Sequence, residues 1–357
     1  MAPSVGIRGV ALYLPPIVRG NDWWPSDTVA RWQRASADRA ALPPPALRGP
    51  GAARVMAALA EQAVDPFQGA VSRHVMPDDM TVLDMAEQAG RQAIARAGVS
   101  VDDIDLVLTH TVMPELLLGN PATQIHHRLG LPRRCFAMET TAAAYSFLMQ
   151  LTLAEAMIAS GRATLALLVQ ACGASRLVEA DDPYAPLFGD GATAVVVGRV
   201  AEGHGIRACV HHADGRYPNT LVASVRGGSW SDPGRGVIHV ADALQMRDVF
   251  LATAEVCKES IDAVLEVAGL TAGDLDFFAM YQGTPWIRRV VQDYAGLQRV
   301  RAVDSFAETG YLFSAILPAG LVRAEQAGLL APGDLVLLTG GGTGIAFGSL
   351  VMRWGSR

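Results

Sequence analysis

The chain has 357 residues, of which 50% are hydrophobic and 18% are charged, and its formal net charge is −6. That composition excludes a disordered or fibrous chain and is typical of an α/β enzyme with several buried strands. The acidic balance and the absence of any run of Lys or Arg argue against nucleic acid as a partner. The length suits two domains or one large duplicated unit.

The N-terminal segment MAPSVGIRGVALYLPP lacks a basic region followed by a long apolar one, so no signal peptide is predicted. The longest apolar stretches, near the C-terminus, are broken by glycines and predict buried strands, not membrane spans. We therefore expect a cytoplasmic protein that does not enter a membrane. The four cysteines have no CxxC spacing, so neither a metal site nor a disulfide is predicted, and no cofactor is expected. They are Cys135, Cys172, Cys209 and Cys257.

Strand-like runs alternate with helical patterns along the chain, which predicts βαβ units and a largely parallel sheet. A first strand is expected in GIRGVALYLPP. An insertion follows within about residues 20–75, where AALPPPALRGPGAARV (40–55) predicts a surface loop. Beyond it, an amphipathic helix leads into a short apolar strand (82–110). A second helix (139–161) and a strand (165–173) complete this part of the chain.

The second half of the chain repeats this plan in the same order. Both halves carry an amphipathic helix, a turn, an acidic D-[IL]-D pattern and an apolar strand, followed by a second helix and strand. Three matched elements at a nearly constant spacing indicate an ancient duplication. The expected halves are 1–200 and 201–357. The matched segments are 82–110 with 252–281, 139–161 with 307–330, and 165–173 with 335–344, and Asp103 and Asp105 pair with Asp274 and Asp276.

Several motifs resemble β-ketoacyl-ACP synthase III, a family of the thiolase superfamily. The most specific is LFGDGATAVVVG (187–198), because F-G-D-G-A marks the end of the first half in that family. NPATQIHHRLGL (120–131) is similar to a segment that lines the acyl pocket across the dimer, and GTGIAFGSLVMRW (342–354) is similar to the family's ending. The resemblance implies an α/β thiolase fold, a duplicated five-layer αβαβα structure with the active site between the halves, and a homodimer.

The family's catalytic triad has different side chains at its positions here. In the family a cysteine at the start of a buried helix attacks an acyl thioester, its thiolate favoured by the helix dipole. A histidine and an asparagine then bind the incoming malonyl thioester. The motifs CFAMETTAAAYSF, FFAMYQGTPW and ETGYLFSAILP place Ala142, Tyr281 and Tyr311 at these positions. The resemblance therefore implies a natural replacement of the triad or, for Ala142 alone, an engineered one.

Other groups near these positions have a chemical and a structural interpretation. Glu139 is a possible base or a favourable partner of the helix dipole, and Thr284 replaces the last residue of the family's His-Gln-Ala-Asn motif. The two tyrosines are hydrogen-bond donors or simply fill the substrate cavity. His110, the repeat counterpart of Tyr281, and Cys172 are packing residues or alternative catalytic groups. Backbone N–H groups of Ala142 and of Gly342, Thr343 and Gly344 are the expected oxyanion donors.

Two functions follow from the resemblance, and the residues leave both open. One is an acyltransferase of specialised metabolism, of polyketide or fatty-acid type, that moves an acyl group from ACP or CoA directly to an acceptor. The other is a non-catalytic subunit that partners an active ketosynthase in a heteromer. The expected partner is acyl carrier protein or acyl-CoA. Arg288 and Arg289 form the candidate carrier-binding surface, unless they are only a solvated helix face.

Overall fold

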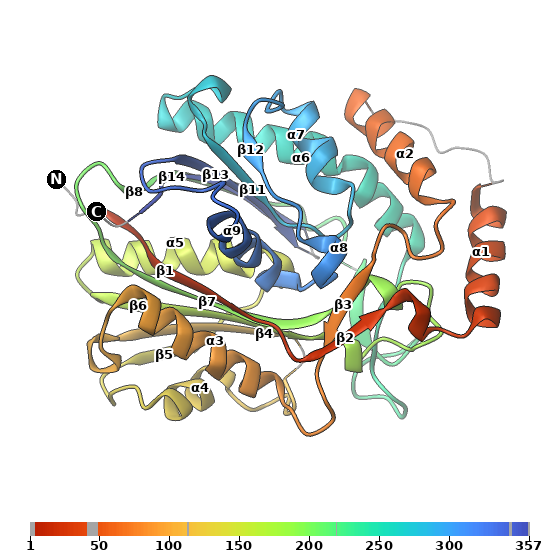
Figure 1. Cartoon of the computed structure of the whole chain (residues 1–357), viewed down its shortest axis with the longest axis horizontal. Coiled ribbons are helices and arrows are strands. Elements are labelled where there is room, and N and C mark those ends of the chain that lie inside the picture. The colour runs from red at the N-terminus through yellow and green to blue at the C-terminus, as the bar shows by residue number, and fades with distance from the viewer. Residues whose placement is uncertain (1–3, 41–48, 113, 219, 343–344, 356–357) are drawn as a thin grey trace.

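Two five-stranded sheets with the same strand order form the framework of the chain (Figure 1). The structure is a computed structural model that describes residues 4–112, except 41–48, and residues 114–355, except 219 and 343–344. The first sheet has the order β1 (Val5–Tyr13), β7 (Asp190–Arg199), β6 (Leu165–Gly173), β4 (Leu106–Val112) and β5 (Phe136–Glu139). The second has the order β8 (Gly205–Ala213), β14 (Ala346–Arg353), β13 (Leu335–Gly342), β11 (Phe277–Met280) and β12 (Arg301–Ala302).

The strand directions match as well as the order. In each sheet the first two pairs are antiparallel and the last two are parallel. The aspartates of the repeated D-[IL]-D pattern also have matching contacts. Asp105 accepts hydrogen bonds from the backbone N–H groups of Thr164 and Leu165, at the start of β6, and Asp276 accepts one from Leu335, at the start of β13. The predicted duplication is therefore present in the sheets and in their connections.

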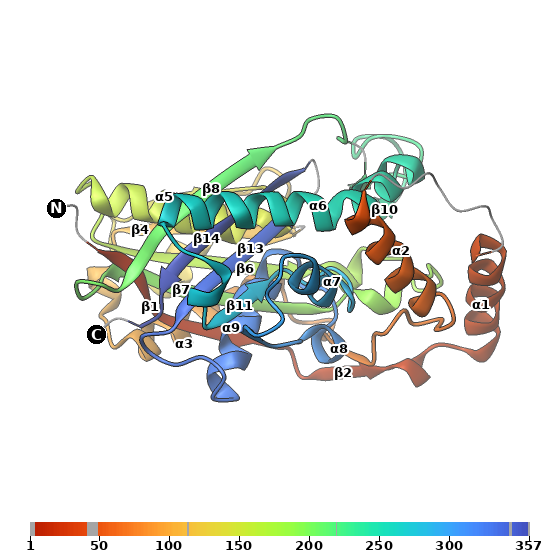
Figure 2. The same ribbon diagram turned by 90° about the horizontal axis from the view of Figure 1, so that it is seen from above.

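Helices form three layers around the two sheets (Figures 1 and 2). Helices α3 (Val82–Ala97) and α4 (Pro121–Leu129) pack on the outer face of the first sheet. Helices α5 (Ser146–Ala159) and α9 (Ile316–Gln326) lie between the sheets, and α6 (Ala243–Ala268) and α7 (Ile287–Tyr294) cover the second sheet from outside. The arrangement is αβαβα. No helix of the described ranges is long and apolar enough to cross a membrane.

The apolar pattern of each helix explains its layer. Helix α5 (SFLMQLTLAEAMIA) is apolar around most of its circumference, because both of its sides face a sheet. Helix α3 has one apolar face and solvent on the other. Its ends follow local rules: Thr81 and Asp84 form a capping box, and Gly98 adopts the left-handed conformation that ends the helix.

The predicted insertion contains two helices, α1 (Ser26–Ala40) and α2 (Pro50–Gln62). The expectation of a loop over 40–55 is therefore wrong from Pro50 onward, and 41–48 lie outside the described residues. Pro50 stands at the first position of α2, where its missing N–H costs nothing. Helix α2 packs its small residues on α6, and Gly51 N–H donates to Glu255.

The remaining elements are short. They are the hairpin of β2 (Ile17–Gly20) and β3 (Ser72–Val75), the hairpin of β9 (Leu221–Ser224) and β10 (Val237–Val240), and helix α8 (Phe306–Thr309).

Candidate active site

A strained turn before helix α5 carries Ala142. The next residue, Ala143, has a φ of 48°, which is uncommon for a residue other than glycine. Phe313, at the matching turn before α9, has a φ of 50°. Each residue begins a short 3₁₀ turn, Ala143–Tyr145 or Phe313–Ala315. Backbone strain in both of these equivalent turns, one in each half of the chain, is typical of a site that the surrounding structure fixes in place.

The backbone N–H of Ala142 already has a partner. It donates to the Ser146 hydroxyl at 2.8 Å, inside the first turn of α5. To serve as an oxyanion donor, this N–H would have to exchange Ser146 for a thioester oxygen. The carbonyl of Ala142 packs against Gly342 so closely that a Cβ there would overlap it. Thr343 and Gly344, the other expected oxyanion positions, lie outside the described residues.

Tyr281 and Tyr311 lie together at the second-half side of the site. A Cβ added at Gly283 would be 3.5 Å from a ring carbon of Tyr281 and 3.7 Å from one of Tyr311. Tyr311 also stacks on Phe313, with 4.6 Å between ring centroids. Burial raises the pKa of both phenols, so both stay protonated and act as hydrogen-bond donors or as packing. The structure therefore brings together Tyr281 and Tyr311, two of the three residues that the sequence assigned to the triad, as large neutral rings.

The side chain of Gln282 fixes the loop after Tyr281 to the segment 303–306. Its amide donates to Val303 O and accepts from the N–H groups of Ser305 and Phe306. The next polar residue, Thr284, is 9% exposed, and its hydroxyl has no hydrogen-bond partner among the described residues. An unpaired buried hydroxyl costs about 1–3 kcal/mol, so it marks a position where a bound group or water would be favourable.

Glu139 ends strand β5 and is tied to the neighbouring strand. Its carboxylate accepts from the Thr109 hydroxyl and, at 2.7 Å, from the backbone N–H of Thr111. Burial raises the pKa of this carboxyl, although both hydrogen bonds oppose the shift. Glu139 is thus a half-buried acid of raised proton affinity, positioned by strand pairing and not by the helix start. The structural interpretation as a partner of the helix dipole receives no support from these contacts.

His110 is buried beside the segment that leads to Ala142. Its Nδ1 bonds to Thr140 O at 3.0 Å, and its Nε2 has no partner in the described part of the chain. Because Thr140 O can only accept, Nδ1 carries the proton and Nε2 is a free acceptor. Burial lowers the pKa of His110 to about 4.

We expect His110 to make the protein less stable in acid. Its folded-state pKa of about 4 is below the usual 6.5, so the unfolded chain binds the proton first. Stability is fully present above pH 6.5 and falls toward pH 4, by up to about 3 kcal/mol. Guanidinium denaturation of wild type and of His110→Phe, from pH 7.5 to 4.5, should show a steeper loss in wild type. His127→Gln, at an exposed position, is the control; equal slopes in all three proteins would contradict the prediction.

None of the four cysteines has the low thiol pKa that a catalytic nucleophile needs. Cys172 is fully buried and its thiol lies 3.4 Å from Gly189 O. Burial raises the pKa of all four thiols, to about 11 for Cys135 and about 12 for Cys257. The interpretation of Cys172 as a packing residue fits its burial and its contact.

Thiol titration will test this description of the cysteines. At pH 7.5 we expect only the half-buried Cys209 to react with an aromatic disulfide before unfolding, and to react slowly, because the other three thiols are buried and the pKa of Cys209 is itself raised. All four thiols should react in guanidinium. Rapid modification of Cys172 in the native protein would instead identify an accessible, activated thiol.

The two candidate carrier-binding arginines differ in the structure. Arg288 makes a bidentate pair with Asp304, both contacts being 2.6 Å, and its side chain is only 12% exposed. This residue holds the loop before α8 and is not available to a partner. Arg289 is exposed and lines a hollow of about 260 Å³ between α2 and α7, together with Arg54.

Sequence reasoning missed a hydrogen-bonded chain that joins the two halves at the site. Tyr145 Oη bonds to His211 Nδ1, and His211 Nε2 lies 3.0 Å from the Thr152 hydroxyl. That hydroxyl donates onward to Leu148 O, so His211 carries its proton on Nε2 and accepts from Tyr145. Tertiary structure alone brings these residues together. The one hint in the sequence is a pair of glycines, Gly340 and Gly348, which lie opposite each other on neighbouring strands and leave space for the Tyr145 ring.

Comparisons with known proteins agree with this architecture. Models of 3-oxoacyl-[acyl-carrier-protein] synthase III match residues 138–215 and, for its C-terminal part, residues 265–354. β-Ketoacyl-[acyl-carrier-protein] synthase III 1 of Halalkalibacterium halodurans is 32% identical over 293 residues, 80% of this chain and 88% of that protein. A synthase III of Cereibacter sphaeroides is 34% identical over 292 residues with the same coverage.

Solved structures give the same result. The synthase III (FabH) of Pseudomonas aeruginosa superposes with a TM-score of 0.79 and 27% identity over 99% of this chain and 98% of that one. OleA of Xanthomonas campestris has a TM-score of 0.78 at 20% identity, over 99% of both chains, which shows the shared fold alone. The fold and these likenesses define a thiolase-fold protein. More particularly, the chain belongs to the β-ketoacyl-[acyl-carrier-protein] synthase III family.

Proposed function

We propose that the chain is a cytoplasmic acyltransferase of specialised metabolism that handles an acyl thioester without a cysteine nucleophile. The motif CFAMETTAAAYSF supports the proposal, because its spacing assigns Ala142 to the position of the family cysteine and none of the four cysteines belongs to this motif's helix start. A methyl group cannot form an acyl-enzyme. Any transfer must then proceed by direct attack of an acceptor on the thioester of ACP or CoA, with proximity supplying much of the rate.

Three groups of the site suit such a transfer. Glu139, with its raised pKa, is the candidate proton acceptor for an attacking hydroxyl or amine. The neutral phenol of Tyr281 or Tyr311 is a candidate donor to the thioester oxygen. The orphan hydroxyl of Thr284 is a further candidate for contact with the bound group.

Intact-mass spectrometry tests the proposal. The protein is incubated with a panel of acyl-CoA and acyl-ACP donors, with and without small alcohols and amines as acceptors. We expect an acylated acceptor and no mass added to the protein. A stable adduct of one acyl group on the chain would overturn the cysteine-free mechanism, and its position would identify the nucleophile.

A non-catalytic subunit is the second candidate, and a specific observation favours it. The Ala142 N–H is occupied by Ser146, and two tyrosine rings fill the opposite side of the site. A chain that only shapes or supports an active ketosynthase needs neither an oxyanion donor nor a cavity. This candidate predicts no product with any donor and co-purification with a ketosynthase whose triad is complete.

We also propose that the chain forms a homodimer through the β5 edge. Strand β5 is the outer strand of the first sheet, and its Phe136 is 53% exposed. Three further apolar side chains, Leu116, Leu117 and Leu118, are at least 61% exposed in the loop before α4. Exposed strand edges and apolar patches of this kind are typical of protein contacts. Light scattering after gel filtration should give twice the chain mass, and Leu117→Asp should reduce it.

Carrier binding, on this proposal, depends on Arg289 and not on Arg288. The reversal Arg289→Glu should weaken binding of acyl carrier protein about tenfold, since a rim charge contributes about 1 kcal/mol or more to an acidic partner. The control is Arg207→Glu, at an exposed position of β8. Fluorescence anisotropy of labelled carrier protein measures both. Equal affinity for wild type and Arg289→Glu would remove this surface as the docking site.

A further inference from the structure

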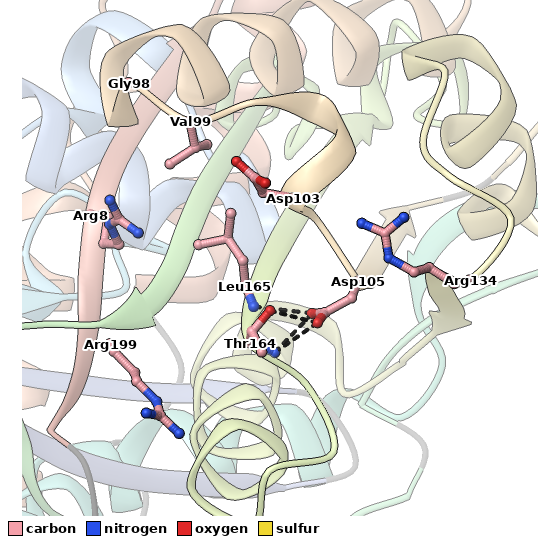
Figure 3. A pocket seen from close by; sticks show the side chains of 9 residues that line it. All are labelled: Arg8, Gly98, Val99, Asp103, Asp105, Arg134, Thr164, Leu165 and Arg199. Atoms are coloured by element: carbon pink, nitrogen blue, oxygen red, sulfur yellow. Dashed lines mark hydrogen bonds between the residues drawn. The ribbon is translucent and has the colours of Figure 1, made fainter.

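A second hollow lies at the end of the first sheet opposite Ala142. It has a volume of about 480 Å³ and opens where β4 and β6 begin, whereas Ala142 follows the far end of β5 (Figure 3). Three arginines line it, Arg8, Arg134 and Arg199, in a chain whose net charge is negative. Arg8 and Arg199 lie on one side of the hollow, and Arg134 and Asp105 on the other.

The two carboxylates that line this hollow, Asp103 and Asp105, accept hydrogen bonds from backbone N–H groups. Asp105 accepts from Thr164 N–H at 2.9 Å, from the Thr164 hydroxyl at 2.6 Å and from Leu165 N–H at 3.0 Å. Asp103 accepts from the N–H of Ser100 at 3.3 Å, as part of a capping box. Asp105 in particular has its acceptor capacity met by neutral donors. It therefore does not pair with the arginines across the hollow.

The side chains of Arg8 and Arg199 have neither an ion pair nor a hydrogen bond with the described residues. The strand pairing explains why Arg8 is displaced from the ladder: the register of β1 shifts between Ile7 and Gly9. Gly198 supplies the space beneath it, because a Cβ there would lie 3.1 Å from the Arg8 side chain and 2.8 Å from that of Leu165. Val5 pairs with Arg199 across the same two strands, so Arg199 lies three residues along the ladder from Arg8, at the end of β7, and borders the same hollow.

Two unpaired guanidinium groups bordering one hollow match the chemistry of a phosphate. Guanidinium binds phosphate oxygens in a bidentate fork, with bonds about twice as strong as neutral ones. The volume exceeds what a single inorganic ion needs and lies in the range of small-molecule sites. We propose that this hollow binds a phosphorylated small molecule, with its phosphate held by the unpaired arginine side chains that border the hollow and its hydroxyl-bearing remainder toward Asp103 and Thr164.

Isothermal titration with four probes tests the site: adenosine 5′-monophosphate, ribose 5-phosphate, inorganic phosphate and adenosine. The protein is used at full length and low ionic strength. We expect both organic phosphates to bind, and adenosine not to bind. The double variant Arg8→Ala/Arg199→Ala should lose at least about tenfold in affinity for both. Arg207→Ala, which removes an exposed arginine of the other sheet, is the matched control and should bind like wild type.

The two organic phosphates distinguish the possible sources of the ligand. Tighter binding of the nucleotide identifies a nucleotide site, and equal binding identifies a sugar-phosphate site. Arg8→Lys/Arg199→Lys keeps the charge but loses the fork, so an intermediate affinity is expected, and a circular-dichroism melt confirms that each variant is folded. Binding of neither organic phosphate, equal binding by the double alanine variant, or an equal loss in Arg207→Ala would each overturn the proposal.

Discussion

Gly189→Ala should lower the free energy of unfolding by about 3 kcal/mol or more, a large effect for the addition of a single methyl group. A Cβ at Gly189 would overlap the carbonyl oxygen of Thr309. Neither backbone can move aside easily. Gly189 N–H donates to Tyr311 O at 3.3 Å, and Tyr311 N–H donates to Leu187 O at 2.6 Å. Guanidinium denaturation measures the change.

The control for this prediction is Gly215→Ala. A Cβ at Gly215 would meet no atom within 4 Å, so its effect should stay within about 0.5 kcal/mol of wild type. A Gly189→Ala protein as stable as the Gly215→Ala protein would show that the junction between the halves can open. The same contact gives F-G-D-G-A a physical meaning: its first glycine is where the first half touches the Tyr311 loop of the second.

The triple variant Ala142→Cys/Tyr281→His/Tyr311→Asn should form an acyl-enzyme. The rate of its acylation should be at least about 100-fold higher than that of Ala142→Cys, which should show no acyl-enzyme on the same time scale. In the single variant the Ser146 hydroxyl still occupies the N–H of residue 142, and two protonated tyrosines still fill the second-half side of the site. The triple variant removes both phenol rings and supplies the histidine and the asparagine with which the family binds its thioester. Intact mass after incubation with acetyl-CoA gives the rate of adduct formation.

Two comparisons make this result interpretable. Ala142→Ser/Tyr281→His/Tyr311→Asn has the same cavity without a thiol and should form no thioester. Alkylation by iodoacetamide then shows whether Cys at position 142 is accessible in each variant. Rapid acylation of the single variant would mean that the tyrosines do not obstruct the site, and that only the cysteine separates this chain from an active synthase.

Much of the fold could be predicted from the sequence, because short sequence patterns that recur in both halves show the repeat. The D-[IL]-D pairs, the matched helices and the glycine-rich ending each follow from short stretches, and the two sheets repeat one another strand by strand. The insertion was less predictable. Its proline run indicated a loop, but the segment from Pro50 is helical because α2 buries Val55 and its small neighbours against α6. Tertiary packing outweighed the local signal there.

The sequence assigned positions to the candidate site but could not predict its contacts. Motif spacing assigned Ala142, Tyr281 and Tyr311 to it, and that assignment stays a prediction; the structure adds that both tyrosines lie against Gly283. The bond from Ala142 N–H to Ser146 and the pair of Arg288 with Asp304 were not predictable. The first depends on the strained turn at Ala143, and the second joins residues that local patterns do not connect.

The packing of Tyr145 distinguishes the two halves of the chain at their junction. Its ring crosses from the first half onto Gly340 and Gly348 of the second, where a larger residue would collide with it. The reverse arrangement does not exist: the counterpart of Tyr145 is Ala315, and the counterpart of Gly340 is Gln170, which bonds to Gln150. The two halves are therefore complementary at this junction, since one carries the ring and the other the glycines, and neither half carries both.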